Sequence, residues 1–233
     1  MRTSIKTILS FAALASAFTA IALLAPVTTQ AQENPFYIKG DLGGAFTEKA
    51  LLLGVLRDGA PPVKFDPGAR VGFTAGYQLT DWVAAEAQLG AMVNSMVSEF
   101  PGDPFRFANG TLANVPLLIN LNLRYPNRSP WVPYVGAGVG GSAAIIDADI
   151  LDASLPDQFI RAHATGADAV FAYQAFAGLS YELNKQLKIH LEYRYFVTEG
   201  PQWDVNLRSY LIENIALSSI KTHTISLAFD YRF

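Results

Sequence analysis

Apolar and polar side chains alternate at every second position in eight stretches of this 233-residue chain. In the clearest stretch, residues 187–195, aliphatic and aromatic side chains alternate with Lys188, His190, Glu192 and Arg194. A period of two puts each kind of side chain on its own face of a β-strand. The other stretches span residues 36–46, 70–79, 83–94, 114–124, 134–140, 173–181 and 225–233. The pattern predicts an all-β chain whose strands each have one apolar face.

These apolar faces must be covered by a protein core or by lipid, and the lengths of the strands and loops favour lipid. Hydrophobic residues make up 51% of the chain, yet beyond residue 31 no apolar run approaches the length of a membrane-spanning helix. Each apolar face extends over roughly nine to eleven residues, which is enough for a tilted strand to cross a bilayer. The connections alternate between tight turns and long loops, as in membrane barrels. Because hydrocarbon requires every backbone group to be paired, we expect a closed, eight-stranded, antiparallel, up-and-down transmembrane β-barrel.

The N-terminus has the pattern of a secretory signal peptide. Arg2 and Lys6 precede an apolar run over residues 8–25, and a small-residue stretch ends at Ala31. We therefore predict that residues 1–31 are cleaved and that residues 32–233 form the barrel domain, starting at Gln32.

Charge and cysteine content exclude several classes of function. Two of the 17 basic residues fall in the predicted signal peptide, which leaves 15 against 20 acidic ones. Such a chain is a poor partner for nucleic acid. The absence of cysteine excludes disulfides and thiol catalysis.

The polar strand faces would point into the barrel and carry many charges. A charge in a barrel lumen must be paired or hydrated. Since eight strands enclose a space that side chains can fill, an ion-pair network that plugs the lumen is favoured over charges that line an open pore. We expect Glu86 and Arg194, from opposite walls, at its centre. The full predicted network is Asp41, Glu86, Arg124, Glu192, Arg194 and Asp230.

Motifs for catalysis or cofactor binding are weak. The glycine-rich stretch 136–141 formally matches a dinucleotide fingerprint, but no helical pattern follows it, so we expect its glycines to make room for Phe176 and Tyr134. The histidines His163, His190 and His223 lie too far apart in sequence for a local metal pair. Serines near His223 are close only along the chain. No enzyme activity, metal or cofactor is therefore expected.

Two segments between the predicted strands stand out, because the first is unusually apolar for a loop and the second mixes aliphatic residues with acids. Residues 51–56 read L-L-L-G-V-L, and residues 145–152 read I-I-D-A-D-I-L-D. Either segment could fold over the barrel mouth, extend a strand, or bind a partner or a small apolar molecule.

The chain resembles the small outer-membrane barrel family that includes opacity-type proteins, the OmpA-like transmembrane domain and porin-like proteins. The resemblance rests on G-Y-Q-L-T-D-W at 76–82, P-Y-V-G-A-G-V-G at 133–140, L-E-Y-R-Y at 191–195 and the aromatic C-terminal strand. It implies that the protein lies in the bacterial outer membrane, where its partners are lipid and the assembly machinery. We expect the protein to be a monomer. The resemblance also implies that Phe229, Tyr231 and Phe233 form the assembly signal.

Such barrels host many functions, so two hypotheses stand side by side. The first is a structural or surface-interaction barrel whose lumen is filled by side chains. The second is a narrow channel or transporter for small, possibly apolar, solutes.

Overall fold

The computed structural model describes residues 35–53, 62–97, 105–152, 160–203 and 215–233, all of them strand, turn or irregular structure. No helix in these ranges is long and apolar enough to cross a membrane. The predicted signal peptide lies outside the described residues. The strands are β1 (Phe36–Thr47), β2 (Ala50–Leu53), β3 (Pro62–Phe65), β4 (Gly68–Gln78), β5 (Val83–Val97), β6 (Phe105–Arg124), β7 (Trp131–Asp152), β8 (Ile160–Glu182), β9 (Leu187–Thr198), β10 (Gln202–Trp203), β11 (Ile215–Leu217) and β12 (Ile220–Arg232).

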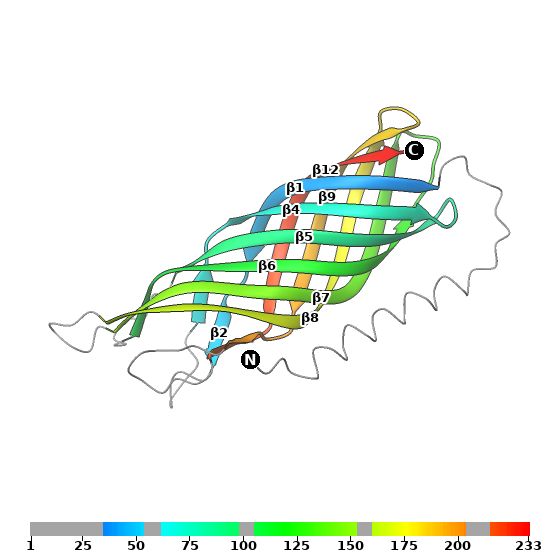
Figure 1. Ribbon diagram of the computed structural model, residues 1–233. Coiled ribbons are helices and arrows are strands. Elements are labelled where there is room, and N and C mark those ends of the chain that lie inside the picture. Colours follow the sequence, from blue (N-terminus) through cyan, green and yellow to red (C-terminus); the bar gives the residue numbers. More distant parts are fainter. Residues whose placement is uncertain (1–34, 54–61, 98–104, 153–159, 204–214) are drawn as a thin grey trace.

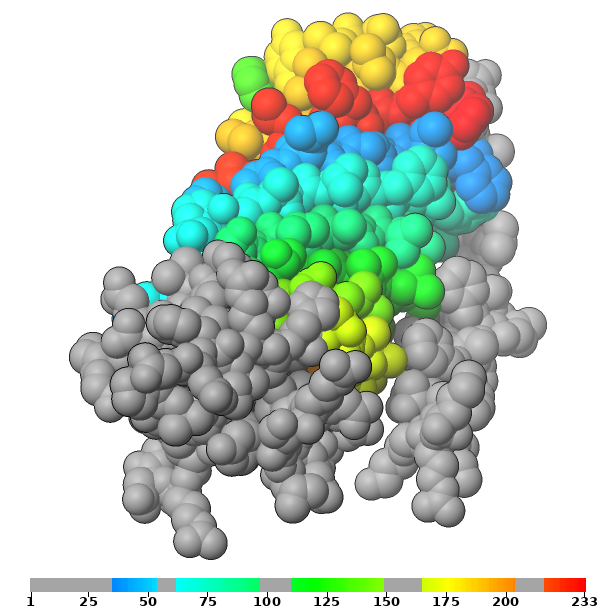
Figure 2. All heavy atoms as spheres, turned by 60° about the vertical axis from the view of Figure 1, so that its left-hand side comes forward, coloured from blue at the N-terminus to red at the C-terminus, as the bar shows by residue number. Residues whose placement is uncertain are grey.

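Eight of these strands close into a barrel. From β4 to β9 each long strand pairs antiparallel with the next, and β12 joins β9 to β1, which returns to β4. Figure 1 shows the wall that they form, and Figure 2 shows the red β12 next to the blue β1 on the barrel surface. Tight turns at residues 79–82, 125–130 and 183–186 lie at the end where the chain terminates. The predicted eight-stranded antiparallel barrel is confirmed.

Four short strands continue the wall at the opposite end. There β2 pairs with β3 and β11, β11 pairs with β10, and β3 pairs with β5. The strands β6, β7 and β8 reach the same end and are 20, 22 and 23 residues long. Strands of this length exceed by far what a bilayer crossing needs. The barrel therefore extends well beyond one membrane thickness on the side of the long connections.

The predicted inward and outward faces are also found. On β12, for example, Phe229 is 57% exposed, whereas the neighbouring Asp230 is 2% exposed. The outward faces of the barrel strands present a belt of large aliphatic and aromatic side chains, while the inward faces bury polar ones. This is the reverse of a water-soluble barrel, and it suits a wall surrounded by lipid.

The structure extends strands into regions expected to be long connections. Residues 145–152 belong to β7, and residues 51–53 lie in β2. Both segments therefore form strand, while the binding of a partner or of a small apolar molecule stays a prediction. Residues 54–56 of the first segment lie outside the described part of the chain.

The lumen changes character along the barrel axis. In the middle, a small buried apolar cluster joins five residues from five strands: Ala45, Met92, Leu118, Ala172 and Phe196. Beyond it, at the extended end, lies a larger apolar core formed by Ala50, Leu52, Val63, Met96, Leu112, Ala144, Ile146, Ala148, Trp203, Leu217 and Ile220. The charged residues lie on the other side of the small cluster, toward the tight turns.

Candidate functional site

Four charged side chains of alternating sign form a chain across the lumen. Lys39 on β1 places its Nζ atom 3.7 Å from Oε1 of Glu86 on β5 and 3.4 Å from Oε2 of Glu192 on β9. Glu192 in turn pairs with Arg194 on the same strand. All four side chains are at most 2% exposed. Each carboxylate thus faces at least one cation, which is the condition for burying charges at tolerable cost.

Hydroxyl and amide groups also donate hydrogen bonds to the two carboxylates. The Tyr37 hydroxyl donates to Oε1 of Glu86 over 2.6 Å, and the Asn122 amide donates to the same oxygen over 2.9 Å. The Tyr134 hydroxyl donates to Oε2 of Glu192 over 3.0 Å. Hydrogen bonds to a charged acceptor are stronger than neutral ones, so these donors hold the carboxylates in place.

Aromatic rings support the cations of this network. The Arg194 guanidinium lies 4.9 Å from the centroid of the Phe176 ring, and the Lys39 ammonium lies 5.9 Å from that of Tyr134. A cation over a ring face is attracted by the ring quadrupole, more so where water is excluded. The rings also fill the volume between the charges.

Glycines make room for these rings. A Cβ atom at Gly136 would overlap the Phe176 ring, and one at Gly178 would overlap the Tyr134 ring. Gly136 therefore has the space-making role predicted for the glycine-rich stretch, while the room for Tyr134 comes from Gly178 on β8. The stretch continues a strand, β7, without the helix that a dinucleotide site needs.

A layer of side-chain amides lies next to the charges. Arg194 donates to Oε1 of Gln88 over 2.5 Å, and Gln174 donates to the same oxygen over 2.7 Å. Gln174 also donates to Oδ1 of Asn120 over 2.6 Å. Since these residues come from β5, β6, β8 and β9, the layer ties four strands together across the lumen.

The structure gathers only part of the predicted network. Glu86, Glu192 and Arg194 belong to one network, but Glu86 reaches Arg194 through Lys39 and Glu192. The predicted network did not include Lys39, which bridges Glu86 and Glu192. The signal that could have found it is a lysine on the polar face of a predicted strand.

The other three predicted members lie apart from this chain of charges. Asp41 pairs with Arg70 on β4 over 2.8 Å, with both side chains 1% exposed. Asp230 lies 3.5 Å from His190. Arg124 donates to Gln78 over 2.6 Å near the tight turns. Asp41 lies two residues along β1 from Lys39, whereas Asp230 is the register partner of Lys39 on β12 but contacts His190 instead.

The predicted assembly residues all face outward on the last strand or just beyond it. Phe229, Tyr231 and Phe233 are 57%, 42% and 57% exposed. The rings of Tyr231 and Phe233 meet edge to face, with centroids 5.4 Å apart. Their part in assembly stays a prediction.

The side-chain contacts of the described histidines His190 and His223 are with residues other than serine. His223 bonds through one ring nitrogen to the Tyr193 hydroxyl at 2.6 Å and through the other to Glu48 at 2.9 Å. The side chain of His163 lies outside the described part. Within that part, no group of three potential ligand residues is arranged to hold a metal ion.

Comparison with solved structures supports the fold. The Neisserial surface protein NspA matches with a TM-score of 0.51 and 16% identity, covering 85% of this chain and 97% of that one. The outer membrane protein OprG from Pseudomonas aeruginosa matches with a TM-score of 0.53 and 11% identity, covering 86% and 97%. The outer membrane protein AlkL in lipid bilayers gives 0.51 and 16%, covering 88% and 94%. At these identities the likeness shows the fold alone.

Sequence comparison places the chain in a family. Uncharacterized proteins of Brucella abortus, Brucella suis and Brucella melitensis are 29% identical over 149 residues, which cover 57% of this chain. The chain spans about half the length of these curated relatives, because the match covers 52% of each. The family model for the outer membrane protein beta-barrel domain matches residues 11–233. The chain therefore belongs to the outer membrane β-barrel family, and its place is the bacterial outer membrane.

Proposed function

We propose that this barrel has a structural or surface-interaction role and that its lumen is closed. The observation that carries the proposal is the chain of ion pairs from Glu86 through Lys39 to Glu192 and Arg194, which crosses the lumen from β5 to β9. With the amide layer and the apolar clusters beyond it, this chain fills the space that eight strands enclose. A solute would have to break several buried ion pairs to pass.

The extended end of the barrel supports the surface-interaction part of the proposal. Tight turns and both ends of the barrel domain lie at one end, which by the pattern of such barrels is the periplasmic side. The opposite end, with its own apolar core, then stands outside the cell and carries the long connections. A packed core beneath them makes a rigid base from which they can meet a partner.

We further infer that the barrel is not an enzyme. The hydrogen-bond partners of His223 are a tyrosine and a glutamate, and His190 faces Asp230 inside the lumen. Ser180 is the register partner of His190, but its hydroxyl donates to the backbone carbonyl of Val132, so neither histidine activates a serine.

One observation favours a second candidate, a narrow channel for small apolar solutes. The extended half of the lumen is lined by aliphatic side chains and Trp203, so an apolar solute that entered there would meet a matching surface. In this case the ion-pair network would have to rearrange to let the solute through.

Dye uptake by intact cells separates the two candidates. The apolar dye N-phenylnaphthylamine enters slowly through an intact outer membrane, and cells that carry the assembled barrel are compared with cells that lack it. A closed barrel leaves the uptake rate unchanged. Faster uptake by the cells that carry the barrel would favour the channel.

The proposed partners are outer-membrane lipid and the assembly machinery, with the barrel as a monomer. Phe233 and Phe36 offer a matched test of the assembly signal, since they are 57% and 60% exposed at the same end of the barrel. If the terminal ring serves as a signal as well as an interface anchor, Phe233→Asp lowers the assembled fraction far more than Phe36→Asp. Equal losses, measured by membrane fractionation, would leave only the anchoring role.

A further inference from the structure

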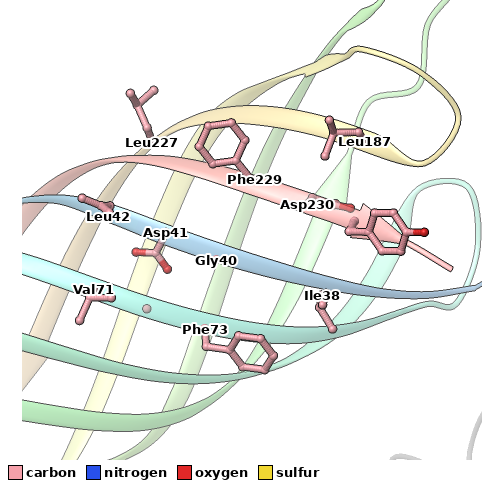
Figure 3. Close-up of a pocket in the computed structure, with 12 residues that line it drawn as sticks. Ile38, Gly40, Asp41, Leu42, Val71, Phe73, Leu187, Leu227, Phe229 and Asp230 are labelled. Carbon is pink, nitrogen blue, oxygen red and sulfur yellow. The ribbon is translucent and has the colours of Figure 1, made fainter.

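The outer surface of the barrel has a groove where the first strand meets the last. It has a volume of about 730 Å³ and spans β1 together with parts of β4, β9 and β12. Gly40 on β1 forms its floor, and its register partners on the two neighbouring strands are Phe73 and Phe229. Figure 3 shows Gly40 between these two aromatic side chains. At its floor the groove therefore lacks one side chain, at Gly40, between two phenyl rings.

Gly40 is open in a way that the next outward-facing glycine of β1 is not. A Cβ atom there would meet nothing within 4 Å, whereas one at Gly44, the next glycine on the same face, would meet the Phe46 ring at 3.2 Å. No neighbouring side chain of the barrel therefore fills the space above Gly40. Packing within the protein gives no reason for a glycine at this position.

The surroundings of the groove are apolar and face outward. Ile38 and Leu42 close it along β1, with Leu227 on β12 and Val71 on β4 beside them. Leu42 is 68% exposed and Val71 is 57% exposed, so these walls belong to the lipid-facing belt. Because the groove is continuous with the surface that meets the membrane, its occupant must be as apolar as hydrocarbon.

The groove also lies at a defined depth. Its lining includes Leu187, the first residue of β9 after a tight turn, and Tyr231, close to the end of β12. Both positions are near the periplasmic end of the barrel. Lys185, exposed in the turn just before Leu187, supplies a positive charge at this end. A phosphate at the membrane surface would be attracted to it.

We propose that this groove binds one acyl chain of a phospholipid from the periplasmic leaflet. The chain lies over Gly40 between the rings of Phe73 and Phe229, and the phosphate lies toward Lys185. The site is independent of the proposed function, since it stands whether the lumen is closed or conducts. It requires the location in the outer membrane and the orientation proposed above, with the tight turns on the periplasmic side.

Native mass spectrometry in a mild detergent tests the proposal. The assembled protein is titrated with phosphatidylethanolamine, and the bound fraction is compared for the wild type and for Gly40→Leu, which fills the groove. Ala137→Leu is the matched control, because Ala137 is an exposed outward residue on β7, a strand that contributes nothing to the lining. We expect the wild type and the control to hold one lipid, and Gly40→Leu to bind it about tenfold more weakly, as the loss of about two buried methylene contacts implies.

A second variant keeps the test decisive if Gly40→Leu does not assemble. Phe73→Ala removes one wall and lies outside the predicted assembly signal, and it should weaken binding in the same direction. Equal binding by wild type, Gly40→Leu and Ala137→Leu would overturn the proposal. So would preferential binding of lipid A over phosphatidylethanolamine, or a protein dimer that Gly40→Leu abolishes.

Discussion

One half of the lumen buries polar and charged side chains and the other half buries apolar ones, although the same strands build both. Toward the end with the tight turns, β12 buries Asp230 and exposes Phe229. At the start of the same strand it buries Ile220, at 0% exposure, and exposes Lys221. The apolar face therefore changes sides along one strand. The change of surroundings explains it: inside the membrane the outer wall meets hydrocarbon, whereas beyond the membrane it meets water and the apolar side chains must turn inward.

Because the two halves bury different side chains, different interactions stabilise them. The membrane half is held inside by buried ion pairs and hydrogen bonds, whose loss leaves uncompensated charges. The outer half is held by an ordinary apolar core, whose loss leaves cavities. Substitutions in the two halves should therefore differ in how much they lower the free energy of unfolding and in which half of the barrel they destabilise.

The largest effect is expected for Glu192→Gln in the membrane half. Glu192 pairs with both Lys39 and Arg194, so its neutralisation leaves two buried cations short of a partner. We expect the free energy of unfolding to fall by about 3 to 5 kcal/mol. Urea unfolding in detergent measures it, with Asp81→Asn in an exposed turn as the control, expected within about 0.5 kcal/mol of wild type. A Glu192→Gln variant as stable as this control would show that water already solvates the lumen charges.

The next effect is expected for Leu112→Ala in the outer half. Leu112 on β6 is 0% exposed within the large apolar core. Its truncation should cost about 3 kcal/mol and open the outer half to protease on intact cells. The control is Leu117→Ala on the lipid-facing side of the same strand, where lipid refills the space. If Leu112→Ala is no more sensitive to protease than Leu117→Ala, the outer core does not stabilise this half.

The smallest effect is expected for the coupling between Glu86 and Arg194. These side chains act on each other through Lys39 and Glu192, whereas Glu192 and Arg194 are in direct contact. A double-mutant cycle with Glu86→Gln and Arg194→Gln should give a coupling energy below about 1 kcal/mol, less than the cycle for Glu192 and Arg194. An equal or larger coupling for Glu86 and Arg194 would mean that the network rearranges to bring them together.

The sequence predicts the membrane half of the fold well because one simple rule holds there. Every second residue from Leu187 to Tyr195 faces lipid, and the same rule gives the inward positions of Glu86, Glu192 and Arg194. It fails for the outer extensions of β6, β7 and β8. Around Leu112 and Ile146 the apolar face has moved inside, so the alternation changes phase and resembles the end of a strand.

The partners inside the lumen were harder to predict than the faces. Alternation tells which side a residue faces but not its height along the axis, and height depends on the stagger of neighbouring strands. Asp41, Arg124 and Asp230 face inward as expected, yet their partners are Arg70, Gln78 and His190, outside the chain of charges from Glu86 to Arg194. The role of Lys39 as the bridge also depends on stagger, because it joins strands that are distant in sequence.

Conductance of the refolded wild-type protein in planar bilayers tests the central claim, a lumen closed by side chains, most directly. The ion-pair chain and the amide layer above it should prevent any steady current, and an Arg194→Ala, Glu192→Ala double variant, which removes side chains from the centre of the network, should raise the conductance above the wild-type baseline. A steady current through the wild-type barrel, unchanged in the double variant, would contradict the closed lumen and favour the narrow channel.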